Sequence, residues 1–418
     1  MKRIIIFICI SFSLTCCSDK KIEGEYLVID VVNSAGKYQR VYCSDYFSSI
    51  ELIPLETREE CLLDVVPYPK IVLNDSCIFM RGNNRLFAFN HSGNFLNQIG
   101  ERGQGPEEYL YLTNYFLNPD KPAVCVESYP KIIEYDFNGN FISSFKRLTV
   151  SRNLLRNYSY AGDGLFIATV RYDGKNRYKY CLVSQDGDTV KCFRNHIFYN
   201  GKEKFSSSDD GSLEPIRVDD QLYLKDYIND TLYVLANSDL HPAYVFGFGE
   251  YSYPKERLET LDGHLNYPNT FRFGVASGSL VGTSKFFFYH IVVPDLFPRP
   301  KAKPVYNHIL NEYRSGDRAV YGIYNIEQNT NILLDTDQHF QKGIINDLNG
   351  GLPFIPRYYV GNGLVADVWS AMDMKDILTE KYFASQEIKD PKAHQELKEL
   401  LKNLKDDDNP VVVIAKLK

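Results

Sequence analysis

A hairpin pattern recurs along the first half of the chain and constrains the fold more than any other feature. An apolar strand, a turn with a central glycine and a second apolar strand occur at residues 86–96, 131–142 and 180–193. The turn glycines Gly93 and Gly139 lie 46 residues apart, and Gly187 follows 48 residues later. A period of roughly 40 to 50 residues holds about four strands, which is one blade of a β-propeller.

The remaining strands allow a full set of blades. We assign blades to about residues 65–100, 113–146, 156–194 and 216–248, an interrupted fifth blade to 271–334, and a sixth that begins near residue 358. The sequence therefore predicts an all-β fold, a six-bladed β-propeller with four-stranded antiparallel blades. Because closing the ring removes exposed sheet edges, we expect the apolar C-terminal segment 411–417 to complete the last blade with an N-terminal strand near 47–55.

The period changes between residues 372 and 405, where a small helical insert is predicted before the closing strand. Leu397, Leu400, Leu401 and Leu404 have the i, i+3, i+4, i+7 spacing of one helical face. Asp390 followed by Pro391 is a suitable N-cap and first-turn pair.

The N-terminus has the order of an export signal. Lys2 and Arg3 precede an apolar run at residues 4–14, which is too short to span a bilayer. The following Leu14-Thr15-Cys16-Cys17 resembles the lipobox of bacterial lipoproteins, which implies acylation of Cys17; an ordinary signal peptide cut nearby is the alternative. The expected organisation is a signal peptide at 1–16, a tether at 17–24 and a single propeller at 25–418. Ser18 after Cys17 favours the outer membrane, with either face open.

The net charge limits the classes of partner that fit the chain, and the cysteines bear on the redox compartment in which it folds. Removal of Lys2 and Arg3 takes the net charge from −6 to −8, which disfavours nucleic acid or an anionic membrane surface as the main partner. The mature chain keeps six further cysteines without C-x-x-C spacing, and several lie in apolar strands. Buried free thiols are the favoured interpretation, although export would permit one disulfide between residues that the sequence does not identify.

A glycine-rich segment separates the first two predicted blades. In Gly103-Gln104-Gly105-Pro106-Glu107-Glu108-Tyr109 the glycines permit positive φ, and Pro106 excludes the α region at Gly105. We expect a sharp connector and a structural turn motif formed by Gly103, Gly105, Pro106, Glu108 and Tyr109. The order of its glycines does not fit a dinucleotide fold, and no βαβ unit surrounds it.

At this segment the chain resembles the six-bladed β-propeller lipoproteins of Gram-negative envelopes, which are related to NHL-repeat propellers. The resemblance also rests on the hairpin 134–141, on 53–57 (IPLET) and on 409–414 (NPVVVI), so it covers most of the chain. It implies a propeller fold and an envelope location. The family pattern has glycine where this chain has Glu107.

The sequence shows no local catalytic or metal-binding motif. It contains no G-x-S-x-G, H-E-x-x-H, P-loop or EF-hand pattern, and its eight histidines have no ligand spacing. Neither a cofactor nor a metal is expected. In a propeller, however, one residue from each blade can form an axial site without leaving a local motif.

Two classes of function remain. The favoured one is a non-catalytic envelope module for binding or scaffolding; the alternative is a propeller hydrolase or lyase that acts on sugars or lactones. Long predicted loops at about 199–215, 250–270 and 294–316 would enlarge a binding surface. The last one concentrates Arg299, Lys301, Lys303 and Arg314 and could receive an acidic partner, an envelope protein or a glycan.

Overall fold

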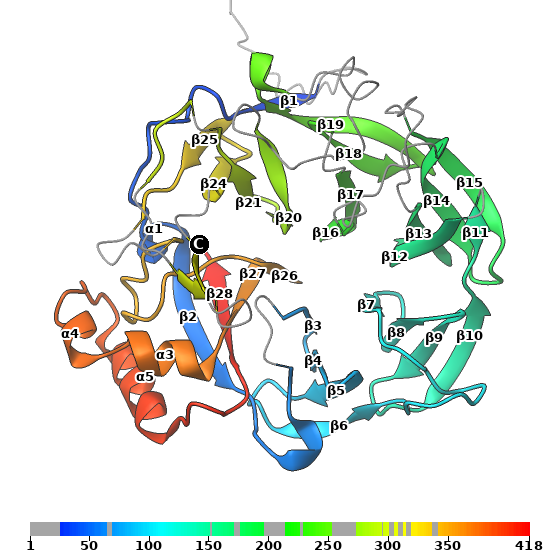
Figure 1. Ribbon diagram of the computed structural model, residues 1–418, viewed down its shortest axis with the longest axis horizontal. Helices are drawn as coiled ribbons and strands as arrows, with labels where there is room; N and C mark the ends of the chain where they lie inside the picture. Colours follow the sequence, from blue (N-terminus) through cyan, green and yellow to red (C-terminus); the bar gives the residue numbers. More distant parts are fainter. Residues whose placement is uncertain are drawn as a thin grey trace, which may run out of the picture.

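The chain forms a ring of six sheets arranged around a central axis (Figure 1). The computed structural model describes residues 26–64, 69–150, 153–170, 176–195, 214–225, 229–252, 273–294, 296–300, 305–307, 312–314, 319–336 and 342–418. All six sheets have an antiparallel four-strand core, which confirms the predicted six-bladed propeller.

The first three blades follow the chain from the inner to the outer strand. Blade 1 contains β3 (Ile71–Leu73), β4 (Ile78–Gly82), β5 (Arg85–Phe89) and β6 (Phe95–Ile99). Blade 2 contains β7 (Asn114–Asn118), β8 (Ala123–Ser128), β9 (Lys131–Asp136) and β10 (Phe141–Lys146). Blade 3 contains β12 (Asn153–Gly162), β13 (Leu165–Val170), β14 (Tyr178–Ser184) and β15 (Thr189–Arg194), with β11 (Thr149–Val150) beside β12.

Blades 4 and 5 have strands in addition to their four-stranded cores. Blade 4 contains β16 (Ile216–Val218), β17 (Gln221–Lys225), β18 (Thr231–Ala236) and β19 (Asp239–Gly247), and β1 (Leu27–Asp30) pairs in parallel with its outer strand β19. Blade 5 contains β20 (Gly274–Gly282), β21 (Phe286–Val292), β24 (Ala319–Asn325) and β25 (Thr330–Leu333). A hairpin of β22 (Val305–Asn307) and β23 (Glu312–Arg314) interrupts blade 5. Strand β1 was not predicted from the sequence.

Blade 6 closes the ring with strands from both ends of the chain. It contains β26 (Tyr358–Gly361), β27 (Leu364–Trp369), β28 (Val411–Leu417) and β2 (Phe47–Pro54), in that order from the axis outward. The C-terminal strand β28 pairs with β27 on one side and with β2 on the other. The C-terminal strand therefore lies between two hydrogen-bonded neighbours, and this pairing closes the ring.

The repeated glycine turns lie within the blades and form packing contacts between successive blades. Gly93, Gly139 and Gly187 lie in the turns before the outer strands of blades 1, 2 and 3, with φ of 81°, 87° and 88°. An added Cβ would lie 1.9 Å from the carbonyl oxygen of Pro54 at Gly93 and 2.4 Å from that of Gln98 at Gly139. Each of these two turns thus packs against the outer strand of the preceding blade. The repeat that predicted the fold is also a contact between blades.

The predicted helical insert packs on the outside of blade 6. It comprises α3 (Ala371–Ile377), α4 (Glu380–Phe383) and α5 (Pro391–Asn403). The side chain of Asp390 caps α5 by accepting hydrogen bonds from the backbone N–H groups of Lys392 and Ala393 at 3.1 and 3.0 Å. Leu397 and Leu404 are buried against the blade, as the apolar stripe predicted. Short helical turns, α1 (Cys43–Tyr46), η1 (Glu59–Cys61) and η2 (Gly249–Tyr251), lie in the connections.

A buried asparagine joins the segments that flank the closing strands. Asn409 Nδ2 donates to the carbonyl oxygens of Glu56 at 2.7 Å and Cys61 at 3.0 Å, and its Oδ1 accepts from the N–H of Leu63 at 3.0 Å. The motifs at 53–57 and 409–414, which are more than 350 residues apart in sequence, therefore meet at Asn409.

Candidate functional site

One end of the central axis carries charged and tyrosine side chains from four blades. We call this end the start rim, because the inner strands β3, β7, β16 and β26 begin there. Lys70 Nζ donates to Asn114 Oδ1 at 2.7 Å and to Glu214 Oε2 at 2.6 Å. Lys70 precedes the inner strand of blade 1, and Glu214 precedes that of blade 4, on the opposite side of the ring (Figure 1). The Lys70–Glu214 ion pair therefore spans the axis.

Two tyrosines hold the backbone beside this ion pair. The Tyr358 hydroxyl donates to the carbonyl oxygen of Pro69 at 2.5 Å, and the Tyr115 hydroxyl donates to that of Lys70. Burial raises the pKa of both tyrosines, so both hydroxyls remain protonated donors at neutral pH. Blades 2 and 6 thereby fix the position of the Lys70 backbone at the start rim.

A buried carboxylate in blade 2 supports the start rim. Glu127, on β8, is 2% exposed and pairs with Arg147 Nη2 at 2.8 Å. It also accepts from Asn114 Nδ2 at 3.3 Å and from the N–H of Tyr158 at 3.2 Å. Burial raises the pKa of Glu127, while the Arg147 guanidinium acts in the opposite direction. Every contact holds this carboxylate inside the protein rather than exposing it to a substrate.

Blade 6 repeats this arrangement. Asp367, on β27, pairs with Arg357 Nε at 2.8 Å and accepts from the N–H of Ile355 at 3.1 Å and from Trp369 Nε1 at 3.3 Å. Its register places it opposite Arg357, which directly precedes β26. Burial raises the pKa of Asp367, and the Arg357 cation opposes that shift.

Buried polar residues occur near the ends of second strands in four blades. They are Glu127, Thr169, Lys225 and Asp367. These residues were not predicted from the sequence, because each blade contributes a single one. The available signal was a polar residue that interrupts the end of an apolar strand, as in 123–127 (AVCVE) and 222–225 (LYLK).

The opposite end of the axis, the end rim, is also bridged. The Tyr359 hydroxyl of blade 6 donates to Asp219, which follows β16 of blade 4. Arg217 donates to the carbonyl oxygen of Tyr160 in blade 3, and burial lowers the pKa of Arg217. Blade 4 is therefore joined to blade 1 at the start rim and to blade 6 at the end rim, and neither is its neighbour in the ring.

An apolar crevice lies between blades 5 and 6. It is a small crevice lined by residues that include Phe288, Tyr321, Ile344, Phe354 and Arg357. Since Arg357 also belongs to the start rim, the rim has an apolar flank next to its charged residues. No group of three or more His, Cys, Asp or Glu residues suitable for a metal ion occurs in the described part of the chain.

The structural turn motif lies between blades 1 and 2, as expected, but the predicted reason for its glycines is wrong. Neither Gly103 nor Gly105 has positive φ. The glycines are needed because the Glu108 carboxylate folds back over them and accepts from the N–H of Gly105 at 2.8 Å. A Cβ at Gly103 would lie 1.9 Å from Glu108 Oε2, and one at Gly105 would lie 3.0 Å from the same carboxylate.

The rest of the motif is tied to the neighbouring strands. Tyr109 is fully buried, and its hydroxyl accepts from the N–H of Leu86 at 3.2 Å; burial raises its pKa to about 12. Lys131 donates to the carbonyl oxygens of Gly105 and Pro106. The segment is therefore a fixed connector whose polar groups are used internally.

The other predicted site residues are described only in part. Cys17, Lys301 and Lys303 lie outside the described residues, as do most of the predicted loops at 199–215 and 250–270. Arg299 lies in the described segment 296–300, and Arg314 is the last residue of β23. Whether these basic residues form one surface stays a prediction.

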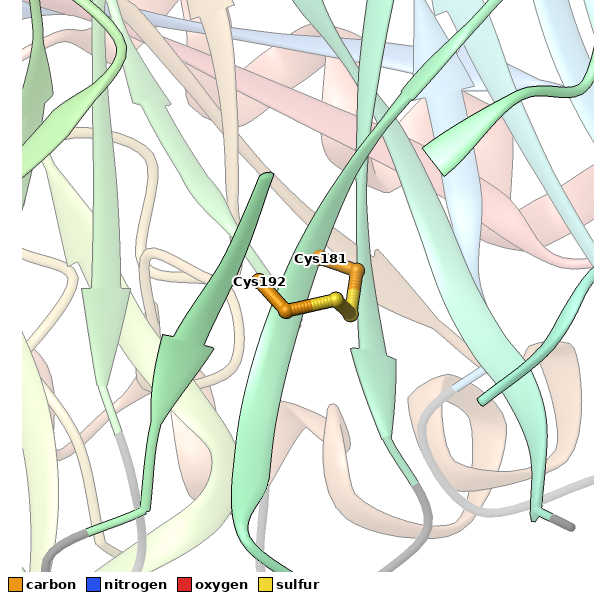
Figure 2. Close-up of a disulfide and its surroundings, with 2 residues drawn as sticks. All are labelled: Cys181 and Cys192. Atoms are coloured by element: carbon orange, nitrogen blue, oxygen red, sulfur yellow. A yellow bond between two sulfur atoms is a disulfide. The ribbon is translucent and has the colours of Figure 1, made fainter. Parts of the chain in front are cut away.

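The favoured interpretation of the cysteines is wrong for one pair. Cys181 on β14 and Cys192 on β15 face each other in register and form a disulfide (Figure 2). Cys43, Cys61, Cys77 and Cys125 are buried free thiols, as expected. The sequence did not reveal the pair, because adjacent positions on a hairpin depend on the strand register.

The chain belongs to the family of the domain of unknown function DUF4934, whose sequence pattern matches residues 26–416. A Bacteroides fragilis protein described as a candidate exported protein has a similar structure, with a TM-score of 0.61 and 17% identity over 94% of this chain and 99% of that chain. A DUF4221 member from Bacteroides vulgatus gives a TM-score of 0.50 and 11% identity over 89% and 97%. These likenesses show the fold alone. No curated protein matches the chain significantly.

Proposed function

We propose that this DUF4934 member is an envelope lipoprotein whose propeller binds a partner and catalyses no reaction itself. The observation that carries the proposal is the state of the carboxylates at the start rim. Glu127 and Asp367 are 2% and 3% exposed at their side chains and are paired with arginines. A carboxylate that serves a hydrolase or lyase as general acid or base must lie within hydrogen-bond reach of the substrate, and these two are occupied by structural contacts.

Glu214 is a further carboxylate at the start rim, and a substrate could reach it. Its side chain is 51% exposed, but Lys70 Nζ lies 2.6 Å from it and belongs to the opposite blade. A general acid or base must be free to reach its substrate, whereas the Glu214 carboxylate is already held by the Lys70 ammonium group. This arrangement favours a surface for recognition over a catalytic centre.

The envelope location is supported by two independent features. The basic, apolar and Leu14-to-Cys17 order at the N-terminus fits export followed by acylation of Cys17, as in the NHL-like propeller lipoproteins that the sequence resembles. The Cys181–Cys192 disulfide fits an oxidising compartment. In the described residues, no helix is long and apolar enough to cross a membrane. The lipid on Cys17 would hold the protein at the outer membrane.

The proposed partner is an acidic envelope protein or glycan, held in part by the basic segment with Arg299, Lys301, Lys303 and Arg314. This segment concentrates positive charge on a chain with a net charge of −6. Opposite charge at a rim or loop raises association rates and suppresses wrong partners.

The test is a pull-down from envelope extract with wild type and with a variant in which those four basic residues become Ser. The matched control replaces the four exposed lysines Lys381, Lys392, Lys402 and Lys405 in and beside the helical insert by Ser. We expect the partner to be lost only with the first variant. A parallel screen covers glycosidase, lyase and lactonase substrates; turnover that Glu214→Gln abolishes would establish the hydrolase or lyase alternative instead.

A further inference from the structure

The outer wall of blade 4 exposes a run of apolar side chains where the described chain begins. Tyr26, Leu27 and Val28 are 49%, 41% and 47% exposed. They are the only three consecutive large apolar residues with such exposure in the part of the chain that the structure describes. The next residue, Ile29, is fully buried against β19 and its neighbours. The strand is therefore fixed to the blade while its first residues face outward.

The position of this run on the wall is set by the strand register. Leu27 pairs with Tyr244 and Asp30 pairs with Gly247, the last residue of β19. Tyr26 therefore lies beside the middle of the nine-residue strand β19, between the two rims. In Figure 1, β1 lies at the outside of the ring, on the side opposite β6 of blade 1.

The segment that follows β1 packs against Pro298, which lies near Gly36 and whose carbonyl oxygen accepts from the Tyr38 hydroxyl at 2.6 Å. Charges of both signs follow the apolar run in the chain, since Asp30 ends β1 and Lys37 lies in the next segment, and both are exposed. The wall is thus apolar with a mixed polar border, and it does not select an anionic surface.

Chain length brings this wall close to any lipid on Cys17. Nine residue steps separate Cys17 from Tyr26, and an extended chain of that length spans at most about 30 Å. The reach would allow either the wall or an adjacent rim to face the bilayer. The exposed apolar side chains favour the wall over the rim, because the transfer of aromatic and aliphatic groups into the membrane interface lowers their free energy.

We propose that the β1 wall of blade 4, formed by Tyr26, Leu27 and Val28, rests on the membrane surface and holds the propeller on its side. This deepens the proposed function, since it rests on a lipid anchor at Cys17. In this orientation neither rim lies against the bilayer. The start rim, with Lys70 and Glu214, faces sideways and is open to a partner in the envelope.

The orientation can be measured without relying on natural acylation. The chain 17–418 is coupled through Cys17 to a maleimide phospholipid in phosphatidylcholine vesicles whose acyl chains are partly brominated, since the described free cysteines are buried. Tryptophan emission is quenched by bromine at short range. The single natural Trp369 is 4% exposed and provides a constant background.

Three variants report on three sides of the ring. Tyr26→Trp probes the wall, Leu96→Trp probes the outer strand of blade 1 at a matched exposure of 46%, and Tyr129→Trp probes the start rim at 61%. We expect the quenched fraction of the added emission to be at least twofold larger for Tyr26→Trp than for either control. Equal quenching, stronger quenching of a control, or none in any variant would overturn the orientation.

Failure of the anchor is detected separately. Mass spectrometry of the wild-type protein and of Cys17→Ala from the host envelope shows whether Cys17 carries acyl chains. An unacylated Cys17 would refute the lipid anchor of the proposed function. The vesicle experiment would then still test separately whether the wall contacts a membrane. Acylation together with an unquenched Tyr26→Trp would refute the orientation alone.

Discussion

Replacement of Asn409 by Ala should destabilise the ring more than any other single change at its closure. The side chain is buried, donates to the carbonyl oxygens of Glu56 and Cys61, and accepts from the N–H of Leu63. Each hydrogen bond contributes about 1 kcal/mol net, and each buried backbone group left without a partner costs about 1–3 kcal/mol. We therefore expect the free energy of unfolding to fall by about 3–5 kcal/mol.

The expected melting shift follows from the size of the domain. Unfolding entropy is about 2.1 cal/mol/K per residue, or about 0.9 kcal/mol/K for a chain of this length. The loss therefore corresponds to a decrease in Tm of about 3–6 °C, measurable by calorimetry or circular dichroism. Asn409→Asp should be at least as damaging, because a buried carboxylate oxygen would face two carbonyl oxygens.

The matched control is Asn403→Ala. Asn403 is exposed near the end of α5 and donates to the Glu399 carbonyl oxygen at 3.1 Å, so its loss should cost less than about 0.5 kcal/mol. If Asn409→Ala melts together with Asn403→Ala, Asn409 does not hold the closure, and the reasoning from its three hydrogen bonds is wrong.

Three further predictions follow from the blades. Deletion of residues 411–418 removes β28 and leaves β2 and β27 without a shared partner, so the protein should lose its cooperative melt or aggregate in sedimentation experiments; an unchanged monomer would contradict the closure. Gly103→Ala should cost about 1 kcal/mol, because its Cβ would displace the end of the Glu108 side chain from the N–H of Gly105. Glu108→Ala should remove most of that cost in the double variant; equal melts of Gly103→Ala and Arg102→Ala would refute this. Burial raises the pKa of Asp367, so the folded state keeps its proton to higher pH than the unfolded chain. The stability of wild type relative to Asp367→Asn should therefore fall as pH rises from about 4 through the raised pKa and stay constant above it, and urea titrations that show the opposite slope would exclude this linkage.

The fold could be predicted because its signals are local. The turn glycines Gly93, Gly139 and Gly187 repeat with the blade and all have the positive φ that favours glycine. Later blades lack this signal: the turn between β18 and β19 uses Asn237 and Ser238 at positive φ, and the helical insert separates β27 from β28. There, strand patterning alone identified the blades.

The candidate site could not be predicted, because its residues meet only in the closed ring. Lys70 lies 44 residues from Asn114 and 144 residues from Glu214, and the three belong to different blades. Each has an ordinary sequence context just before or at the start of an inner strand. The Cys181–Cys192 pair and the β1 strand were missed for a related reason, since both depend on which strands are neighbours and in what register.

The contacts between blades at the two ends of the axis limit where a ligand can bind to the ring. In a propeller each blade contacts its neighbours in the ring, so the axis is the place where a substrate cavity could open. Here Lys70 and Glu214 join blades 1 and 4 at the start rim, and Tyr359 and Asp219 join blades 6 and 4 at the end rim. Each contact joins two blades that are not neighbours in the ring, so widening the channel between them would break an ion pair and a hydrogen bond at once. A ligand is therefore more readily accommodated on the rims and loops than inside the axis, which is the arrangement expected of a rigid binding surface.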